Sequence, residues 1–551
     1  MIFHSPQYVF CFLPVVFFLY YLTHRTSRLT LQNAVFLAAS YLFYSWGRPE
    51  LLILIIISSL IDYRVALALD QTEHPGKRKG MLAISLVTNL GMLAFFKYGR
   101  WLTTLANQFC LARNLPFVVP VLEIPLPPGI SFYTFQALSY TIDVYRRGIP
   151  AKKNAIHFFT YIAFFPQLIA GPIERASSLL TQLTKPRAWI TLRQFEHAIF
   201  LIFFGIMKKT VFADNLGHVV SGCLGRLEAV PGIGFVAVFA FCFQIYFDFS
   251  AYTDIARGSA ALFNVELTYN FKTPYFAVSP SDFWKRWHIT LSRWLRDYLY
   301  IPLGGNRKGR VRTVFNLLAV MTLGGLWHGA GFCFLLWGIY HGLLLIFYRF
   351  LPLDEILVKY GKRGGRLLAM GLMFVLTNIG WMIFMSHSPG MLQGLLQNMG
   401  SGFTAAAFQP FTVWLYPALL FSLPFLPLEI AGYLNGCEFV ELHKKWPAPV
   451  KVAVYYVMFY LIVFMAKREG YDFIYFAFKI LLDLGRPDSS YRGLSLESKW
   501  PPQPLLESFI SSQLPESREL RILHHDREIR ESHERAGHRR FGRGQRRALR
   551  D

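Results

Sequence analysis

Charged side chains are scarce in this chain of 551 residues, where Asp, Glu, Lys and Arg together make up 16% of the sequence. Soluble globular proteins usually carry about 25%. Apolar residues reach 54% and aromatic residues 17%, and the runs 51–57 and 452–465 contain no charged residue. This composition excludes a string of soluble domains and predicts an all-α, polytopic membrane protein.

Cysteine is also rare, and its spacing excludes two further classes. No C-x-x-C pair occurs, and the spacing suggests neither a disulfide framework nor a zinc site, so we expect no bound metal. The cysteines are interpreted as small hydrophobic residues. They are Cys11, Cys110, Cys223, Cys242, Cys333 and Cys437.

Common catalytic signatures are missing as well. The sequence has no Walker motif, no G-x-S-x-G, no H-E-x-x-H and no Rossmann fingerprint, which removes the usual nucleotide-binding, serine-hydrolase and zinc-protease interpretations. The formal charge is +23, from 56 basic and 33 acidic residues. Because the basic residues lie between apolar spans and no nucleic-acid-binding motif occurs, we attribute them to lipid headgroups and membrane orientation rather than to nucleic acid.

The apolar segments predict about eleven membrane crossings, and residues 1–22 are interpreted as a retained first transmembrane helix rather than a signal peptide. One segment, 155–172, is broken by Pro166 and Gly171 and is expected to be re-entrant. The basic residues that follow the first and third spans place the N-terminus outside and the C-terminus in the cytoplasm. The segments are 7–23, 31–46, 50–69, 81–98, 128–145, 155–172, 195–213, 233–262, 314–328, 332–351, 367–386, 411–431 and 450–467.

The composition changes near Gly485. Prolines and serines lead into an arginine-rich stretch with almost no aromatic residues. We therefore expect a transmembrane domain over 1–484 and a basic, disordered cytosolic tail over 485–551. The alternative is a tail that contacts anionic lipid or a partner.

The most unusual block is 279–298. Trp284, Trp287 and Trp294 recur with Leu and Tyr at steps of three and four residues, while Arg286 and Arg293 lie among cations on the opposite face. This spacing predicts an amphipathic helix at the cytoplasmic interface. It leaves His288, at the border of the two faces, unexplained.

A second unusual block surrounds His328, which lies in an apolar span between glycines. An ionisable residue at membrane depth indicates function unless it is a hydrogen-bonded core histidine, and both interpretations stay open at this point. His341 is expected to be structural. Asp248 and Asp254 lie six residues apart, nearly on opposite helix faces, so we expect them to cap or pair with Arg or His rather than to act together.

Taken together, these blocks resemble the membrane-bound O-acyltransferase (MBOAT) family, and within it the bacterial members of alginate O-acetyltransferase type. The resemblance runs from Met1 to about Phe478. The segments that carry it are PGISFYTFQ at 128–136, PQLIAGPI at 166–173, YFDFS at 246–250, the whole of 279–307, GGLWHGA at 324–330 and FIYF at 473–476.

The resemblance implies a ring of about eleven transmembrane helices around a central funnel, with re-entrant and interfacial helices. It implies that the family's buried histidine is His328, here the expected general base, and that its second motif histidine is His288, which would orient a substrate or stabilise the oxyanion. Which histidine does which task stays open. Further candidate substrate-binding residues are Trp284, Arg286, Arg293, Asn306 and Trp327.

The implied activity is transfer of an acyl group, in the first instance acetyl, from a cytoplasmic thioester to a hydroxyl. No bound cofactor is expected, and acetyl-CoA or an acyl carrier protein would be the co-substrate. The acceptor would be an exported polysaccharide such as alginate, or a relay protein, at the bacterial inner membrane, with a periplasmic acetyltransferase or a polysaccharide export complex as partner. The alternatives are D-alanyl transfer toward teichoic acid, acylation of a protein or lipid, and a transporter or channel with an intramembrane proton relay.

Overall fold

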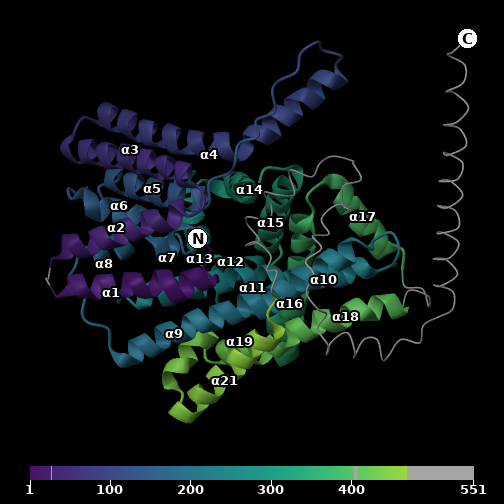
Figure 1. Cartoon of the computed structure of the whole chain (residues 1–551). Helices are drawn as coiled ribbons and strands as arrows, with labels where there is room; N and C mark the ends of the chain where they lie inside the picture. Colours follow the sequence, from purple (N-terminus) through teal and green to yellow (C-terminus); the bar gives the residue numbers. More distant parts are fainter. Residues whose placement is uncertain (26–27, 403–407, 468–551) are drawn as a thin grey trace, which may run out of the picture. The chain divides into compact units, whose positions relative to one another are not determined.

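The computed structural model describes residues 1–25, 28–402 and 408–467. Within these ranges every regular element is a helix (Figure 1). The all-helical prediction is therefore confirmed for the described part of the chain. The predicted boundary at residue 484 and the tail that follows it lie outside these ranges.

The first half of the chain contains α1 (Leu13–His24), α2 (Leu29–Ser45), α3 (Leu52–Gln71), α4 (Pro75–Ala112), α5 (Ile130–Tyr145), α6 (Ala155–Ala163), α7 (Phe165–Leu168), α8 (Thr181–Leu183), α9 (Leu192–Met207), α10 (Asp214–Leu224) and α11 (Ile233–Ala261). The second half contains α12 (Pro280–Arg286), α13 (Ile289–Leu295), α14 (Gly309–His328), α15 (Phe332–Phe350), α16 (Leu353–Met385), α17 (Pro389–Gly400), α18 (Phe408–Ser422), α19 (Leu426–Leu434), α20 (Phe439–Leu442) and α21 (Ala448–Met465). Short 3₁₀ or π turns are η1 (Gln7–Phe12), η2 (Pro49–Leu51), η3 (Ala176–Leu180), η4 (Lys208–Ala213), η5 (Pro274–Phe276), η6 (Arg296–Tyr300), η8 (Leu423–Phe425) and η9 (His443–Lys445).

Eight helices in the described ranges are long and apolar enough to cross a membrane, fewer than the eleven expected. The difference has local causes. α2 and α5 have 17 and 16 residues, and α14 begins with two arginines, Arg310 and Arg312. At 1.5 Å per residue, the two shorter helices reach only about 25 Å, less than the apolar core of a bilayer.

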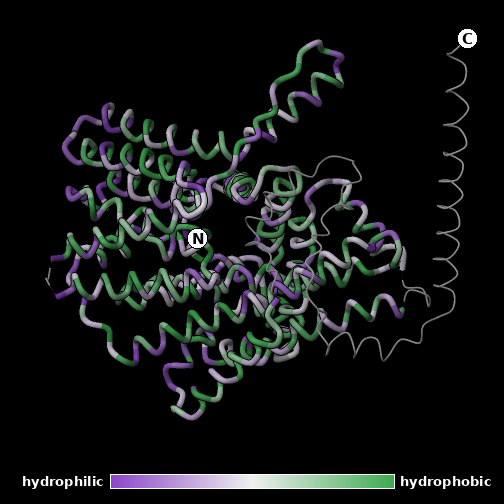
Figure 2. Tube along the Cα trace, viewed as in Figure 1, coloured by the Kyte–Doolittle hydropathy of each residue, from purple (hydrophilic) through white to green (hydrophobic). Residues whose placement is uncertain are grey.

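Large apolar side chains point outward along the spanning helices. Phe18, Val87 and Phe464 are each more than 70% exposed, and Figure 2 shows hydrophobic residues along the helices and hydrophilic ones at many of the connecting loops. Such exposure would be unfavourable in water and is expected where lipid covers the helices. The protein is thus an integral membrane protein.

Close helix packing around α11 organises the centre of the described structure. The N-terminal elements contact α11 at two points: the Tyr8 hydroxyl of η1 lies 2.8 Å from Ser259 Oγ, and the Tyr21 hydroxyl of α1 donates to the carbonyl of Leu262, just after α11, at 3.0 Å. α9 packs against α11 through Gly205 and Gly258, because a Cβ on either would come within 2.7 Å of the other helix's backbone. Small residues of this kind let membrane helices approach closely. Figure 1 shows α9 continuing through η4 into α10 along α11.

The segment 155–172 is broken, as Pro166 and Gly171 predict. α6 ends at Ala163, α7 is a single short turn, and all residues from 161 to 170 are buried. Gly129, at the start of α5, has a φ of +72° and lies so close to this segment that a Cβ would be 2.3 Å from the Leu168 carbonyl oxygen. The motifs 128–136 and 166–173 therefore pack against each other.

Candidate functional site

Two short helices form in the block 279–298, so the prediction of one continuous interfacial helix is wrong. Ser279 caps α12, with its Oγ accepting from the Asp282 N–H at 3.4 Å, as the sequence indicates. α12 ends at Arg286, and α13 starts only after His288, whose φ of 42° lies in the left-handed region.

The break is caused by hydrogen bonds to a distant segment. The Lys272 N–H donates to the Arg286 carbonyl at 2.9 Å, and the Ile289 N–H donates to the Asn270 carbonyl at 3.0 Å. The aromatic face is also buried within the protein rather than in lipid headgroups, because Trp287 is 1% and Trp294 9% exposed. The Trp294 indole N–H donates to the Phe135 carbonyl at 2.9 Å.

His288 is fully buried at this break, with 0% exposure. Neither ring nitrogen forms a hydrogen bond to another residue of the described ranges. Its ring lies 4.7 Å from the Phe249 ring and 6.2 Å from the Phe132 ring, measured between centroids. Desolvation by burial lowers the pKa of His288 to about 3, which keeps the imidazole neutral. A buried polar side chain on a strained backbone is typical of a functional position.

His328 is the last residue of α14, and it lies beside His288. The centroids of the two imidazole rings are 6.5 Å apart, and His328 is 7% exposed. Trp327 and Trp337 flank the His328 ring at 5.0 and 5.1 Å. The fold thus brings two motif histidines, one from the break between α12 and α13 and one from the end of α14, into one aromatic enclosure.

Two glycines near His328, Gly325 on α14 and Gly338 on α15, serve helix packing. A Cβ on Gly325 would come within 2.2 Å of the Phe334 carbonyl oxygen, and one on Gly338 within 2.4 Å of the Met321 carbonyl oxygen. These two glycines let the backbones of α14 and α15 approach each other closely. Beyond Trp337, at 4.7 Å from its ring, lies His341, which is 1% exposed and packs against Trp284.

Lys97 and Tyr98, in the middle of α4, belong to this site, although neither was predicted from the sequence. The Lys97 ammonium donates to the carbonyl oxygen of Trp327, and to Ser131 Oγ at 3.1 Å. The Tyr98 hydroxyl donates to the Leu326 carbonyl at 2.6 Å. Together they satisfy two of the carbonyls left free at the end of α14, next to His328. The sequence feature that could have predicted this role of Lys97 is a single cation within the apolar run 92–98.

The structure brings only some of the other predicted site residues to the histidines. Trp327 contacts both histidine rings, and Trp284 contacts His341. The Arg286 guanidinium is directed to Asp282 and Thr273 instead. Two further candidates are exposed, Arg293 on α13 and Asn306 in the loop before α14.

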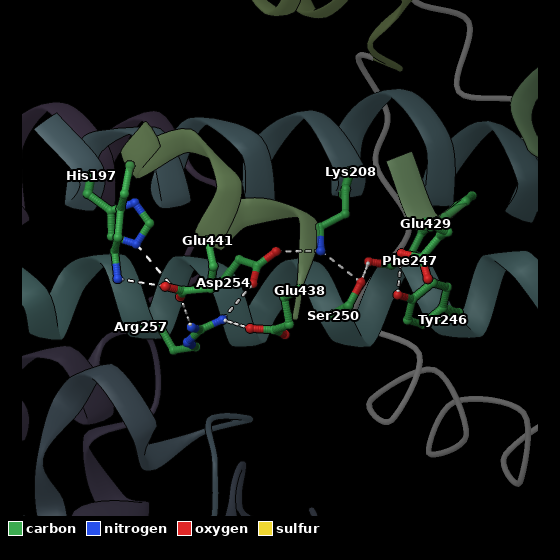
Figure 3. A network of polar contacts seen from close by, with 11 residues as sticks. His197, Lys208, Tyr246, Phe247, Ser250, Asp254, Arg257, Glu429, Glu438 and Glu441 are labelled. Atoms are coloured by element: carbon green, nitrogen blue, oxygen red, sulfur yellow. Dashed lines mark hydrogen bonds and ion pairs between the residues drawn. The ribbon is translucent and has the colours of Figure 1, made fainter. Parts of the chain in front are cut away.

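A buried network of ion pairs lies along α11 (Figure 3). Asp254 pairs with Lys208 and, at 3.6 Å, with Arg257, and Asp248 pairs with Lys209 at 2.9 Å. The expected pairing with Arg or His is confirmed for Asp254, which pairs with Arg257, whereas Asp248 pairs with a lysine instead. Arg257 extends the network to Glu438 at 2.6 Å, which ties the segment before α20 to α11.

Within the described ranges, no three His, Cys, Asp or Glu side chains are grouped as metal ligands. The six cysteines are all free thiols. The groups at the site that could take part in a reaction are the imidazoles of His288 and His328 and the Lys97 ammonium, enclosed by aromatic rings.

Comparison with known proteins identifies the family. Residues 42–352, which include both histidines, match the membrane-bound O-acyltransferase (MBOAT) family. The chain is 38% identical over 407 residues to a protein of Pseudomonas putida named probable alginate O-acetylase AlgI, covering 73% of this chain and 81% of that one.

Two other relatives carry different names. The peptidoglycan O-acetyltransferase of Helicobacter pylori is 34% identical over 411 residues, covering 70% of this chain and 77% of the relative. The teichoic acid D-alanyltransferase of Bacillus subtilis is 27% identical over 280 residues, covering 46% and 68%. On the family match and the identity to these proteins, the chain belongs to the MBOAT family and is a membrane-bound O-acyltransferase.

Proposed function

We propose that this enzyme transfers an acetyl group from a cytoplasmic thioester to a hydroxyl of an exported polysaccharide, directly or through a relay protein. The observation that carries the proposal is the pair of buried imidazoles, 6.5 Å apart in an aromatic enclosure. The names of the relatives at 38% and 34% identity supply the acetyl group and the polysaccharide acceptor.

In the proposed reaction His328 is the general base. Its neutral imidazole accepts the proton of the acceptor hydroxyl as the hydroxyl oxygen attacks the thioester carbonyl carbon. The C–O bond forms, the C–S bond breaks, and the leaving thiolate takes the proton from His328. No proton is gained or lost overall.

His288 is proposed to act beside His328. A neutral imidazole offers one N–H donor and one acceptor nitrogen. With no hydrogen bond to another described residue, His288 is free to donate to the carbonyl oxygen as negative charge develops there, or to orient the hydroxyl. The surrounding aromatic rings exclude water and strengthen either interaction.

The thioester serves as co-substrate, either acetyl-CoA or an acyl carrier protein, and no resident cofactor takes part in these steps. A periplasmic acetyltransferase or a polysaccharide export complex would receive the group. We place the enzyme in the bacterial inner membrane with its N-terminus outside and its C-terminus in the cytoplasm. The catalytic domain would span 1–484, and removal of 485–551 should leave both membrane insertion and acyl transfer intact.

The test is His328→Ala in membrane vesicles supplied with labelled acetyl-CoA and the polysaccharide acceptor. Transfer should fall at least about 100-fold at unchanged abundance, because a general base typically contributes 10²–10⁴-fold. The control is His443→Gln, since His443 is also buried, at 1% exposure, but stacks on Phe200, away from His288. If His328→Ala retained a tenth of the activity, His328 would not be the general base. If the enzyme used a D-alanyl carrier but not acetyl-CoA, the proposed reaction would be replaced by D-alanyl transfer toward teichoic acid.

A further inference from the structure

A cavity of about 320 Å³ lies where the 272–273 segment meets α12, α16 and the end of α19. Its walls include Lys272, Arg286 and Arg366, and none of the described residues that line it is Asp or Glu. Of these three cations only Arg286 pairs with a carboxylate, that of Asp282, so the cavity keeps a positive potential within a small space.

Arg286 is held in a fixed orientation at this cavity. Its Nε donates to Asp282 Oδ1 at 2.9 Å, and its Nη1 donates to Thr273 Oγ1 at 3.1 Å. In the described ranges Nη2 has no hydrogen-bond partner. A guanidinium already positioned in this way loses little side-chain entropy when it binds an anion.

Tyr433 joins Arg286 to Arg366. The guanidinium carbons of the two arginines lie 5.9 and 5.6 Å from the centroid of the Tyr433 ring, which stacks on Phe276 at 4.9 Å. Neither Lys272 nor Arg366 forms an ion pair within the part of the chain that the structure describes. Their charges are therefore available to a ligand.

The backbone of the cavity wall is strained at Thr273, a β-branched residue with a φ of 44°. Such a conformation is unfavourable for a β-branched residue and persists where the surroundings impose it. The neighbouring Lys272 is hydrogen-bonded through its N–H to the Arg286 carbonyl, two residues before His288. The cavity wall and the turn that carries His288 are thus parts of one strained, hydrogen-bonded unit.

We propose that this cavity is a binding site for a phosphate ester, held by Arg286, Arg366 and Lys272 beside the Tyr433 ring. Arg286 offers its Nη2, the planar Arg366 guanidinium can match two phosphate oxygens, and the Lys272 ammonium adds a further contact. A second cavity of about 820 Å³ shares Lys272 and Gly436 with the first and offers room for the rest of the ligand. The phosphate belongs either to the thioester donor or to a phospholipid headgroup, and its binding does not depend on the proposed acyl transfer.

The experiment uses the full-length protein in nanodiscs of phosphatidylcholine, with acetyl-CoA as the first probe and acetyl-pantetheine, which has no phosphate, as the second. Arg366→Gln and Lys272→Gln should each raise the Kd for acetyl-CoA at least tenfold and leave that for acetyl-pantetheine unchanged. Arg349→Gln is the matched control, because Arg349 is an exposed cation in the last turn of α15 and does not line the cavity. Arg366→Lys should restore much of the affinity, which separates loss of charge from misfolding.

A second arm identifies a lipid source. Phosphatidylglycerol is added to the nanodiscs, and its binding is followed by native mass spectrometry and by the shift in Tm. If acetyl-CoA binding is unaffected while Arg366→Gln and Lys272→Gln abolish retention of phosphatidylglycerol, the ligand is a lipid headgroup. If neither probe distinguishes these variants from Arg349→Gln, the phosphate site is wrong. Because binding is measured without turnover, His328→Ala should retain it, so failure of the acyl-transfer proposal would be recognised separately.

Discussion

The ammonium group of Lys97 donates a hydrogen bond to the carbonyl oxygen of Trp327, the residue immediately before His328. The Lys97 nitrogen also lies 5.4 Å from the Trp327 ring centroid. α14 ends at His328, so its last carbonyls have no partner within the helix. Lys97 therefore fixes the end of the helix from which the imidazole projects.

Lys97→Met should reduce acyl transfer by about 100-fold, because misplacement of a catalytic group by about 1 Å has effects of that size. Lys97→Arg retains the charge and donors and should recover part of the rate. Tyr98→Phe removes only the 2.6 Å bond to the Leu326 carbonyl and should have a smaller effect. The measurement is kcat per folded enzyme, and equal rates for Lys97→Met and Tyr98→Phe would show that Lys97 has no special role in positioning His328.

Sequence patterns identified the helices, the glycine-flanked His328 and the broken segment at 155–172, because periodicity and helix breakers act locally. They did not identify the break at His288. The apolar spacing of 279–298 suits one helix, and the interruption comes from hydrogen bonds of Arg286 and Ile289 to Lys272 and Asn270, which no local pattern contains.

The contacts of the site depend on distant segments in the same way. The proximity of His288 to His328 arises from the packing of α12 and α13 near the end of α14, so motif order alone could not supply it. Lys97 differs, because a single lysine in an apolar run is a local signal that points to a buried partner. Its partner is the backbone carbonyl of Trp327, and because every residue has such a carbonyl, the sequence cannot identify this one.

Gly325→Ala should destabilise the enzyme by about 1–3 kcal/mol, the usual cost of overpacking, because the new methyl would lie 2.2 Å from the Phe334 carbonyl oxygen. Gly371→Ala is the control, since nothing lies within 4 Å of its Cβ position. The measurement is thermal unfolding of the purified protein. An unchanged Tm in Gly325→Ala would mean that α14 and α15 are not packed as closely as described here.

Lys209→Met should destabilise the protein strongly, by about 3–5 kcal/mol, because it leaves buried carboxylates without their cation. The Lys209 Nζ lies 2.8 Å from Asp214 Oδ1 and 2.9 Å from Asp248 Oδ1, and all three side chains are at most 3% exposed. Glu73→Gln breaks the exposed pair with Arg147 and should leave the unfolding transition unchanged. Comparable losses of folded protein in the two variants would contradict the burial of the Lys209 cluster.

The loops after α3 and before α14 should lie on one side of the membrane. Arg78 donates to the Tyr145 carbonyl at 2.7 Å, and the neighbouring Arg146 donates to the Asp297 carbonyl at 3.3 Å. These bonds place the start of α4, the end of α5 and η6 at the same end of the helices. The loop between α2 and α3 lies at the opposite end of α3, and positive-inside counting assigns it to the outside.

Single cysteines test this arrangement in a background that lacks the six native ones. Lys79→Cys and Lys308→Cys, both exposed positions, should resist a membrane-impermeant thiol reagent in intact cells and react after permeabilisation. Arg48→Cys, exposed in the loop between α2 and α3, should react in intact cells. Labelling of Lys308→Cys from outside would show that η6 and α12 do not face the cytoplasm. It would also contradict the proposed thioester entrance beside His288.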